Sequence, residues 1–148
     1  MVHVHLGSEE AGRIEKLYEA TSTNTGMGLA AMAAIQGARA RLYLQATIQR
    51  ASDVLLKVLG AEVVRMPRSF TVEFVEDVDR DAKRDGAVHL NQFENDANFE
   101  VHLRFTAKEL ELQLREAGVV PRALVGGIGT SGHMSAIAFY FKNRLGTA

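Results

Sequence analysis

Short apolar runs alternate with longer segments of helical periodicity along most of the chain. The apolar runs predict strands at residues 13–20, 41–44, 62–66, 87–90 and 122–125. The segments between them predict helices at about residues 27–36, 52–59, 71–85 and 98–117. A glycine follows each predicted helix, at positions 37, 60, 86 and 118, where glycine commonly ends a helix. Such alternation is typical of a parallel α/β sheet.

We therefore predict a single three-layer α/β domain over residues 1–148, with a parallel sheet of four to five strands and helices on both faces. The expected strand order is third, second, first, fourth. In that order the direction of winding reverses between the first and fourth strands, where such sheets bind ligands. The predicted fifth strand, 122–125, either extends the sheet or pairs with another subunit, and an exposed edge would favour a homodimer.

Composition narrows the class of protein. The chain has 148 residues, enough for a buried core, and its net charge of -1 with no basic tract argues against binding to nucleic acid. No segment approaches the roughly 20 apolar residues of a membrane span, and the N-terminus lacks the charge order of a signal peptide. The absence of cysteine excludes disulfides and thiolate chemistry. We expect a cytoplasmic protein that does not bind membranes.

A glycine-rich segment, residues 126–133, follows the last predicted strand and precedes a helix-like stretch from Met134. Glycines let backbone N–H groups crowd around a phosphate, and a helix N-terminus adds about half a positive charge. The hydroxyls of Thr130 and Ser131 add donors to the same segment. We call residues 126–133 the glycine loop and predict that it binds a phosphate.

Other readings of the glycine loop fit less well. A dinucleotide site needs a further strand with an acidic residue roughly 20 positions on, and a P-loop needs Lys followed by Ser or Thr. His133 and Met134 occupy the P-loop positions here. A tight turn with packing glycines and no ligand remains an alternative.

Two further polar segments follow predicted strands. The first loop, residues 21–26, holds four hydroxyls and one amide, which suit a carboxylate, although Ser22, Thr23 or Asn24 could simply cap the next helix. The amide segment, residues 91–98, could likewise donate to a ligand or cap a helix. Because all three segments follow strands of one parallel sheet, we expect them at its carboxyl edge, where such folds bind ligands.

Together the three segments resemble the cysteine synthase family of pyridoxal-phosphate enzymes, which have fold type II. The first loop is similar to the family's Thr-Ser-Gly-Asn-Thr-Gly, the amide segment to Gln-Phe-x-Asn-Pro-Ala-Asn, and the glycine loop to Gly-x-Gly-Thr-Gly-Gly-Thr. Residues 91–102 and 129–141 look closest to the archaeal O-phosphoserine sulfhydrylase branch. The resemblance covers about residues 17–143, and residues 122–148 correspond to the start of the second domain in full-length relatives.

The resemblance implies a pyridoxal phosphate cofactor and an amino-acid substrate such as O-phosphoserine or O-acetylserine, converted with sulfide to L-cysteine by β-replacement. The residues that would bind the substrate's α-carboxylate are Thr21, Ser22, Thr25 and Gln92. Asn24 would bind the ring hydroxyl of the cofactor. The residues that would bind its phosphate are Gly129, Thr130, Ser131, Gly132 and His133.

The chain also departs from the family pattern. The substitutions lie at Thr23, Asp96, Ser131 and His133. No lysine matches the family's Schiff-base lysine, so we expect no catalytic residue, non-covalent cofactor binding at best, and no turnover by this chain alone. A non-catalytic binding or regulatory module for a phosphorylated or amino-acid ligand, or an interaction domain, is the alternative. We expect no metal site, since His3 and His5 alternate without a third ligand nearby.

Overall fold

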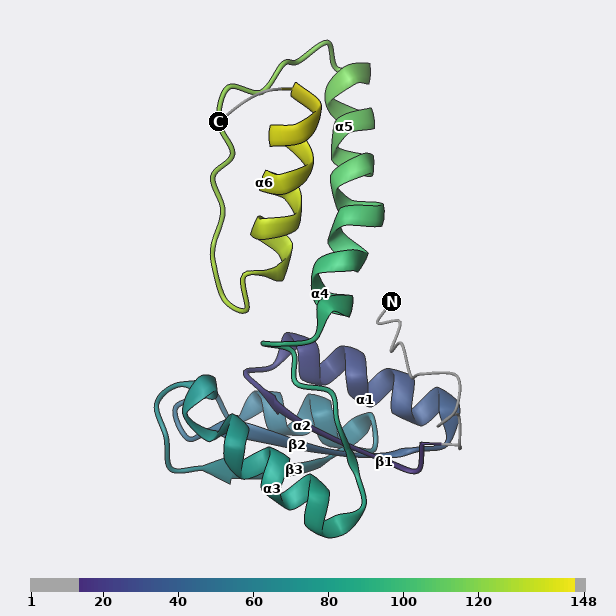
Figure 1. Ribbon diagram of the computed structural model, residues 1–148. Coiled ribbons are helices and arrows are strands. Elements are labelled where there is room, and N and C mark those ends of the chain that lie inside the picture. Colours follow the sequence, from purple (N-terminus) through teal and green to yellow (C-terminus); the bar gives the residue numbers. More distant parts are fainter. Residues whose placement is uncertain (1–13, 146–148) are drawn as a thin grey trace. The chain divides into compact units, whose positions relative to one another are not determined.

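The computed structural model describes residues 14–145. These residues form two compact units, a sheet unit (14–92) and a helical unit (93–145), each described here by itself (Figure 1). The sheet unit contains β1 (Lys16–Thr21), α1 (Asn24–Gln36), β2 (Arg39–Gln45), α2 (Ala51–Val58), β3 (Glu62–Met66), a 3-10 turn (Thr71–Phe74), α3 (Val75–Asp85) and β4 (Val88–His89). The helical unit contains α4 (Asp96–Val101), a π-helical turn (His102–Thr106), α5 (Ala107–Glu116) and α6 (Gly132–Leu145).

The sheet has four parallel strands in the order β3-β2-β1-β4, as the sequence predicted. Tyr18 on β1 pairs with Arg41 on β2 and with His89 on β4, which fixes the register at the centre of the sheet. Helices α1 and α2 cover one face and α3 covers the other (Figure 1). The predicted three-layer α/β architecture is therefore confirmed.

Two apolar clusters, one on each face, hold these layers together. On the side of α1 and α2, the cluster is built from Ala30, Ala33, Ala40, Leu42, Leu44, Leu56 and Ala61. On the side of α3, it is built from Tyr18, Ala20, Tyr43, Phe74, Val78 and Ala82. The small residues of α1 let that helix lie close to the strands. A Cβ on Gly26 would fall 2.8 Å from Thr21 Cγ2, closer than packed atoms come.

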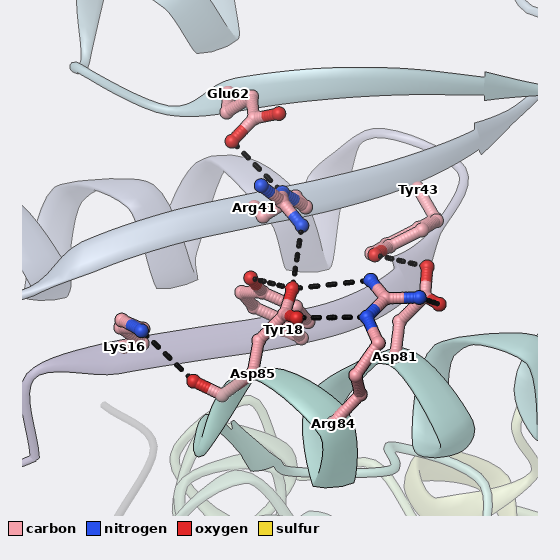
Figure 2. Close-up of polar contacts among 8 residues, drawn as sticks. All are labelled: Lys16, Tyr18, Arg41, Tyr43, Glu62, Asp81, Arg84 and Asp85. Carbon is pink, nitrogen blue, oxygen red and sulfur yellow. Dashed lines mark hydrogen bonds and ion pairs between the residues drawn. The ribbon is translucent and has the colours of Figure 1, made fainter.

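A polar network fastens the end of α3 to the sheet (Figure 2). Asp85 Oδ2 accepts hydrogen bonds from Tyr18 Oη at 2.8 Å and from Arg41 Nη1 at 3.0 Å. Lys16 Nζ donates to the backbone carbonyl of Asp85 at 2.8 Å. Hydrogen bonds from Arg84 and from Tyr18 hold the pKa of Asp85 well below its usual range. This carboxylate therefore joins α3 to β1 and β2.

The helical unit has a smaller apolar core. Ala107 on α5 and Ile137 and Phe141 on α6 are buried, and four partly buried residues surround them, namely Leu110, Leu114, Leu124 and Tyr140. Tyr140 Oη also donates to Glu111 Oε2 at 2.6 Å across the two helices. The long helix predicted at 98–117 is present, with a π-helical turn between α4 and α5.

The predicted fifth strand is wrong. Residues 122–125 adopt no strand, and none of the four described strands pairs with them. An apolar run becomes a strand only when its N–H and C=O groups find such a partner. Val125 instead leaves 95% of its surface exposed. Among the described helices, none combines the length and apolar character needed to cross a membrane.

Candidate functional site

The first loop connects β1 to α1, and its hydroxyls play different parts. Thr21 is fully buried, and its Oγ1 accepts the N–H of Gly26 at 3.0 Å, which satisfies one N–H at the start of α1. Thr23 is the N-cap residue of α1 and its side chain makes no cap hydrogen bond. Ser22 and Asn24 are exposed. Thr21, and not Ser22, Thr23 or Asn24, therefore caps α1. Capping does not account for the exposed side chains of Ser22 and Asn24.

The structure brings Thr25 and Gln92 together. Thr25 Oγ1 donates to Gln92 Oε1 at 2.7 Å, although 67 residues separate them along the chain. Gln92 Nε2 in turn donates to the carbonyl of Ala20 at 2.5 Å. The first N–H groups of a helix have no helical carbonyl to bond, so the start of α1 adds further donors beside this pair. The arrangement can bind a small carboxylate.

A buried carboxyl beneath this site was not predicted from the sequence. Glu19 on β1 is only 1% exposed, and its Oε1 accepts the N–H of Gln92 at 3.4 Å. Burial raises the pKa of Glu19 to about 7, although hydrogen bonds from the backbone of Gln92, Ala20 and Asn91 oppose that rise. The available signal was a glutamate within a strand of buried residues, where glutamate is rare.

The amide segment divides between capping and other contacts. Asn95 Oδ1 accepts the N–H of Ala97 at 3.0 Å and so caps α4, as one of the two interpretations predicted. Asn98 Nδ2 donates to Thr130 Oγ1 at 2.7 Å, which links α4 to the glycine loop within the helical unit. Gln92 contributes to the sheet unit instead.

The glycine loop leads directly into α6. The first bond of that helix runs from the N–H of Ser135 to the carbonyl of Ser131 at 2.9 Å, so the three preceding N–H groups have no helical acceptor. Cβ atoms on Gly127 and Gly129 would meet nothing within 4 Å, whereas one on Gly132 would fall 2.6 Å from the Asn98 side chain. The loop holds no carboxylate. These features together suit an anion such as a phosphate.

His133, the second residue of α6, packs edge-on against His102, with ring centroids 5.4 Å apart. His102 Nδ1 also lies 3.0 Å from Thr106 Oγ1. Burial, together with the charge of His133, lowers the pKa of His102. The described residues contain no group of three or more side chains that could hold a metal ion, and His3 and His5 fall outside those residues.

A parallel sheet with a polar loop after its first strand, and a glycine-rich loop opening a helix, define a class of α/β proteins that bind small anionic ligands. The family model of the pyridoxal-phosphate dependent enzymes matches residues 1–148, and the chain belongs to this family.

Several relatives refine this assignment. The chain is 36% identical to cystathionine beta-synthase of Saccharomyces cerevisiae, over 93% of this chain and 29% of that protein. It is 34% identical to cysteine synthase of Staphylococcus aureus (strain Mu50), over 91% of this chain and 44% of that protein. A mutant of O-ureido-L-serine synthase, solved with O-ureido-L-serine bound, matches with a TM-score of 0.83 and 26% identity, over 89% of this chain and 41% of that one.

The chain therefore spans less than half the length of these relatives. The resemblance to the cysteine synthase family that the three polar segments carried is confirmed, and with it a family in which pyridoxal phosphate is the cofactor.

Proposed function

We propose that this chain forms the ligand-binding part of a cysteine synthase-like enzyme acting on an O-substituted L-serine, such as O-acetylserine or O-phosphoserine. Sulfide replaces the β-substituent and L-cysteine is the product. The observation that carries this proposal is the 2.7 Å hydrogen bond between Thr25 and Gln92, which joins the first loop to the amide segment. The cysteine synthase relatives support the same chemistry.

In this proposal the sheet unit binds the α-carboxylate of the substrate. The donors are the exposed hydroxyl of Ser22, the side-chain amide of Gln92 and the N–H groups at the start of α1. Thr25, whose one hydroxyl proton goes to Gln92 Oε1, joins them by turning that proton toward the carboxylate when the substrate binds. Thr21 acts from beneath, because its hydroxyl holds the N–H of Gly26 and so shapes the loop. Fixing the carboxylate at these donors limits the rotation of the substrate about its α-carbon, which favours loss of the β-substituent.

The residues present also fit pyridoxal phosphate. The glycine loop offers unpaired helix N–H groups, the hydroxyls of Thr130 and Ser131, and no carboxylate that would repel a phosphate. We assign the phosphate to Gly129, Thr130, Ser131, Gly132 and His133. Asn24, exposed in the first turn of α1, is assigned to the ring hydroxyl. When bound, the cofactor supplies the electron sink for β-replacement.

The five lysines support non-covalent binding by this chain. Lys16 donates to the carbonyl of Asp85, and Lys83 pairs with Asp79 at 2.6 Å. The other three are exposed on helices and are Lys57, Lys108 and Lys142. None lies in the first loop, the amide segment or the glycine loop. We therefore propose that the 148-residue chain binds ligand and cofactor without catalysing the reaction alone.

An NMR titration of the ¹⁵N-labelled chain tests both binding roles. O-acetyl-L-serine is expected to shift the amides of Ser22, Thr25 and Gln92, whereas its carboxamide analogue, which lacks the carboxylate, does not. Pyridoxal phosphate is expected to shift the amides of residues 129–133, and pyridoxal, which lacks the phosphate, does not. Gln92→Leu lowers the affinity for O-acetyl-L-serine about tenfold by removing polar partners, while Gln36→Leu, at an exposed position of α1, leaves it unchanged.

Two results would overturn this proposal. One is the absence of any shift of the Ser22, Thr25 and Gln92 amides at the highest O-acetyl-L-serine concentration of the titration. The other is a stable pyridoxal phosphate adduct on a single lysine after borohydride reduction and mass spectrometry, which would contradict non-covalent binding.

A further inference from the structure

Glu19 lies at the centre of the sheet unit, and the proposed function gives it no part. It is buried on β1, and its neighbours along the strand, Tyr18 and Ala20, point to the opposite face of the sheet, into the apolar cluster beneath α3. A buried carboxyl lowers the stability of the fold unless its oxygens are hydrogen-bonded. The presence of Glu19 at this position therefore suggests a role other than stability. Its Oε2 has no hydrogen-bond partner among the residues that the structure describes.

The groups around Glu19 point to that role. Its Oε1 accepts the N–H of Gln92 at 3.4 Å, and the backbone of Asn91 also donates to the carboxyl. The titratable groups that face it are His89 on β4, whose Nε2 lies 3.9 Å from Oε1, and behind it Asp79 on α3, 3.7 Å from His89 Nδ1. The carboxyl therefore reaches the turn that carries Gln92.

We propose that Glu19 is the positioning residue of the carboxylate-binding site. By accepting the backbone N–H groups of the turn at Asn91 and Gln92, it holds the Gln92 side chain between the carbonyl of Ala20 and the hydroxyl of Thr25. Glu19 itself touches no ligand. This inference rests on the proposed function, because the side chain that Glu19 holds is one of the proposed ligand donors.

The strength of the hydrogen bonds that Glu19 accepts depends on pH near neutrality. Burial raises the pKa of Glu19 to about 7, so the carboxyl changes charge in a range where most carboxylates do not. A carboxylate accepts hydrogen bonds more strongly than a neutral carboxyl. The backbone N–H of Gln92 is therefore held more tightly when the pH is above the pKa of Glu19 than when it is below it.

The first test follows the pH dependence of the wild-type chain, with Glu19→Gln as its control variant. The side-chain carboxyl of Glu19 is followed by ¹³C NMR between pH 5 and pH 9, together with the amides of Asn91 and Gln92. The amide shifts are expected to follow the carboxyl with the same midpoint. Glu19→Gln removes that transition, and any titration that arises from His89 persists. Amides that stay constant while the carboxyl titrates would overturn the inference.

The second test measures binding of O-acetyl-L-serine at pH 8. Glu19→Gln keeps one acceptor oxygen but loses the charge, so the affinity falls about fivefold, as expected when a charged acceptor becomes neutral. Glu76→Gln makes the same change at an exposed position of α3 and is expected to have no effect. An affinity that rises in Glu19→Gln would show that the charge merely repels the ligand, and would also overturn the inference.

The two tests separate this inference from the proposed function. If the Gln92 amide follows Glu19 but no O-acetyl-L-serine binds, the proposed function fails and the positioning role stands. If O-acetyl-L-serine binds equally well to wild type and Glu19→Gln, and the amides ignore the carboxyl, the inference fails and the proposed function stands.

Discussion

The sheet unit and the helical unit bury their apolar residues to different extents. The sheet unit has a buried cluster on each face of its strands, and every strand is paired. The helical unit has one cluster with three buried residues, and in the segment between α5 and α6 it leaves Val120 79% and Val125 95% exposed. The strands of the sheet unit thus have their pairing partners within the unit, although its helices also leave Ile35 78% and Val58 79% exposed. The apolar side chains of the segment between α5 and α6 have few partners within the described residues.

The same difference appears at the two candidate binding loops. Gln92 is held by the carbonyl of Ala20 and the hydroxyl of Thr25, and its backbone by the buried Glu19. Thr130 of the glycine loop is held by Asn98. The proposed carboxylate-binding loops therefore have more internal hydrogen bonds than the glycine loop. This contrast yields four predictions.

The largest expected effect comes from the cluster beneath α3. Phe74→Ala is expected to lower the free energy of unfolding of the sheet unit by about 3–5 kcal/mol, because it leaves a cavity in a fully buried cluster. Phe141→Ala makes the same change in the helical unit and should cost less, since fewer buried neighbours surround it. Urea unfolding followed by NMR signals of each unit measures both losses.

Phe70→Ala is the matched control, because Phe70 is 67% exposed. It is expected to change the free energy of unfolding by no more than about 0.5 kcal/mol. Equal losses in Phe74→Ala and Phe141→Ala would remove the distinction between the two cores.

The next effect concerns pH. The free energy of unfolding is expected to change with pH in opposite directions in the two units. The pKa of Glu19 rises from 4.5 to about 7 on folding, so the folded sheet unit binds more protons than the unfolded chain in this window. Its stability is present at low pH and falls by up to about 3 kcal/mol as the pH rises through the window. In the helical unit, the pKa of His102 is lowered, so stability increases as the pH rises toward 6.5.

Urea midpoints of each unit between pH 4.5 and pH 8 test this pair of slopes. Glu19→Gln should flatten the slope of the sheet unit alone. Asp85 cannot account for that slope, because its lowered pKa adds stability only as the pH rises through the acid range near 3.8. Parallel slopes in both units would contradict the assignment.

A third effect concerns the glycine loop. A Cβ at position 132 would fall 2.6 Å from the Asn98 side chain, so Gly132→Ala displaces the partner of Thr130. We expect the affinity for pyridoxal phosphate to fall about tenfold, or about 1.4 kcal/mol. Gly127→Ala is the matched control, since a Cβ there meets nothing within 4 Å. Calorimetric titration with pyridoxal phosphate measures both variants. Equal affinities would contradict the role of Asn98.

Local patterns predicted the sheet unit well. The apolar runs and the glycines that end α1 and α3 are local signals, and Gly37 and Gly86 adopt positive φ angles of 69° and 61° there. The meeting of Thr25 and Gln92 was also within reach, because parallel strands place their following loops at one edge.

The features that the sequence did not predict correctly depend on contacts with distant parts of the chain. Residues 122–125 have the apolar character of a strand, but a strand also needs a neighbour, which no local pattern reveals. Glu19 lies within the predicted strand 13–20, and beyond its residue type no local pattern sets it apart from the rest of that strand. Its contacts are with His89 and Gln92, about 70 residues further along the chain.

The smallest effect separates two neighbouring residues of the same apolar run. Val125 is almost fully exposed, so Val125→Thr is expected to change the free energy of unfolding of the helical unit by less than about 0.5 kcal/mol. Leu124 packs against the cluster of Ala107, Ile137 and Phe141, so Leu124→Ala should cost more, about 1–2 kcal/mol for a partly buried side chain. Urea unfolding of the two variants distinguishes them. Equal and substantial losses would mean that Val125 is covered in solution, and the segment would then have a partner that the described residues do not supply.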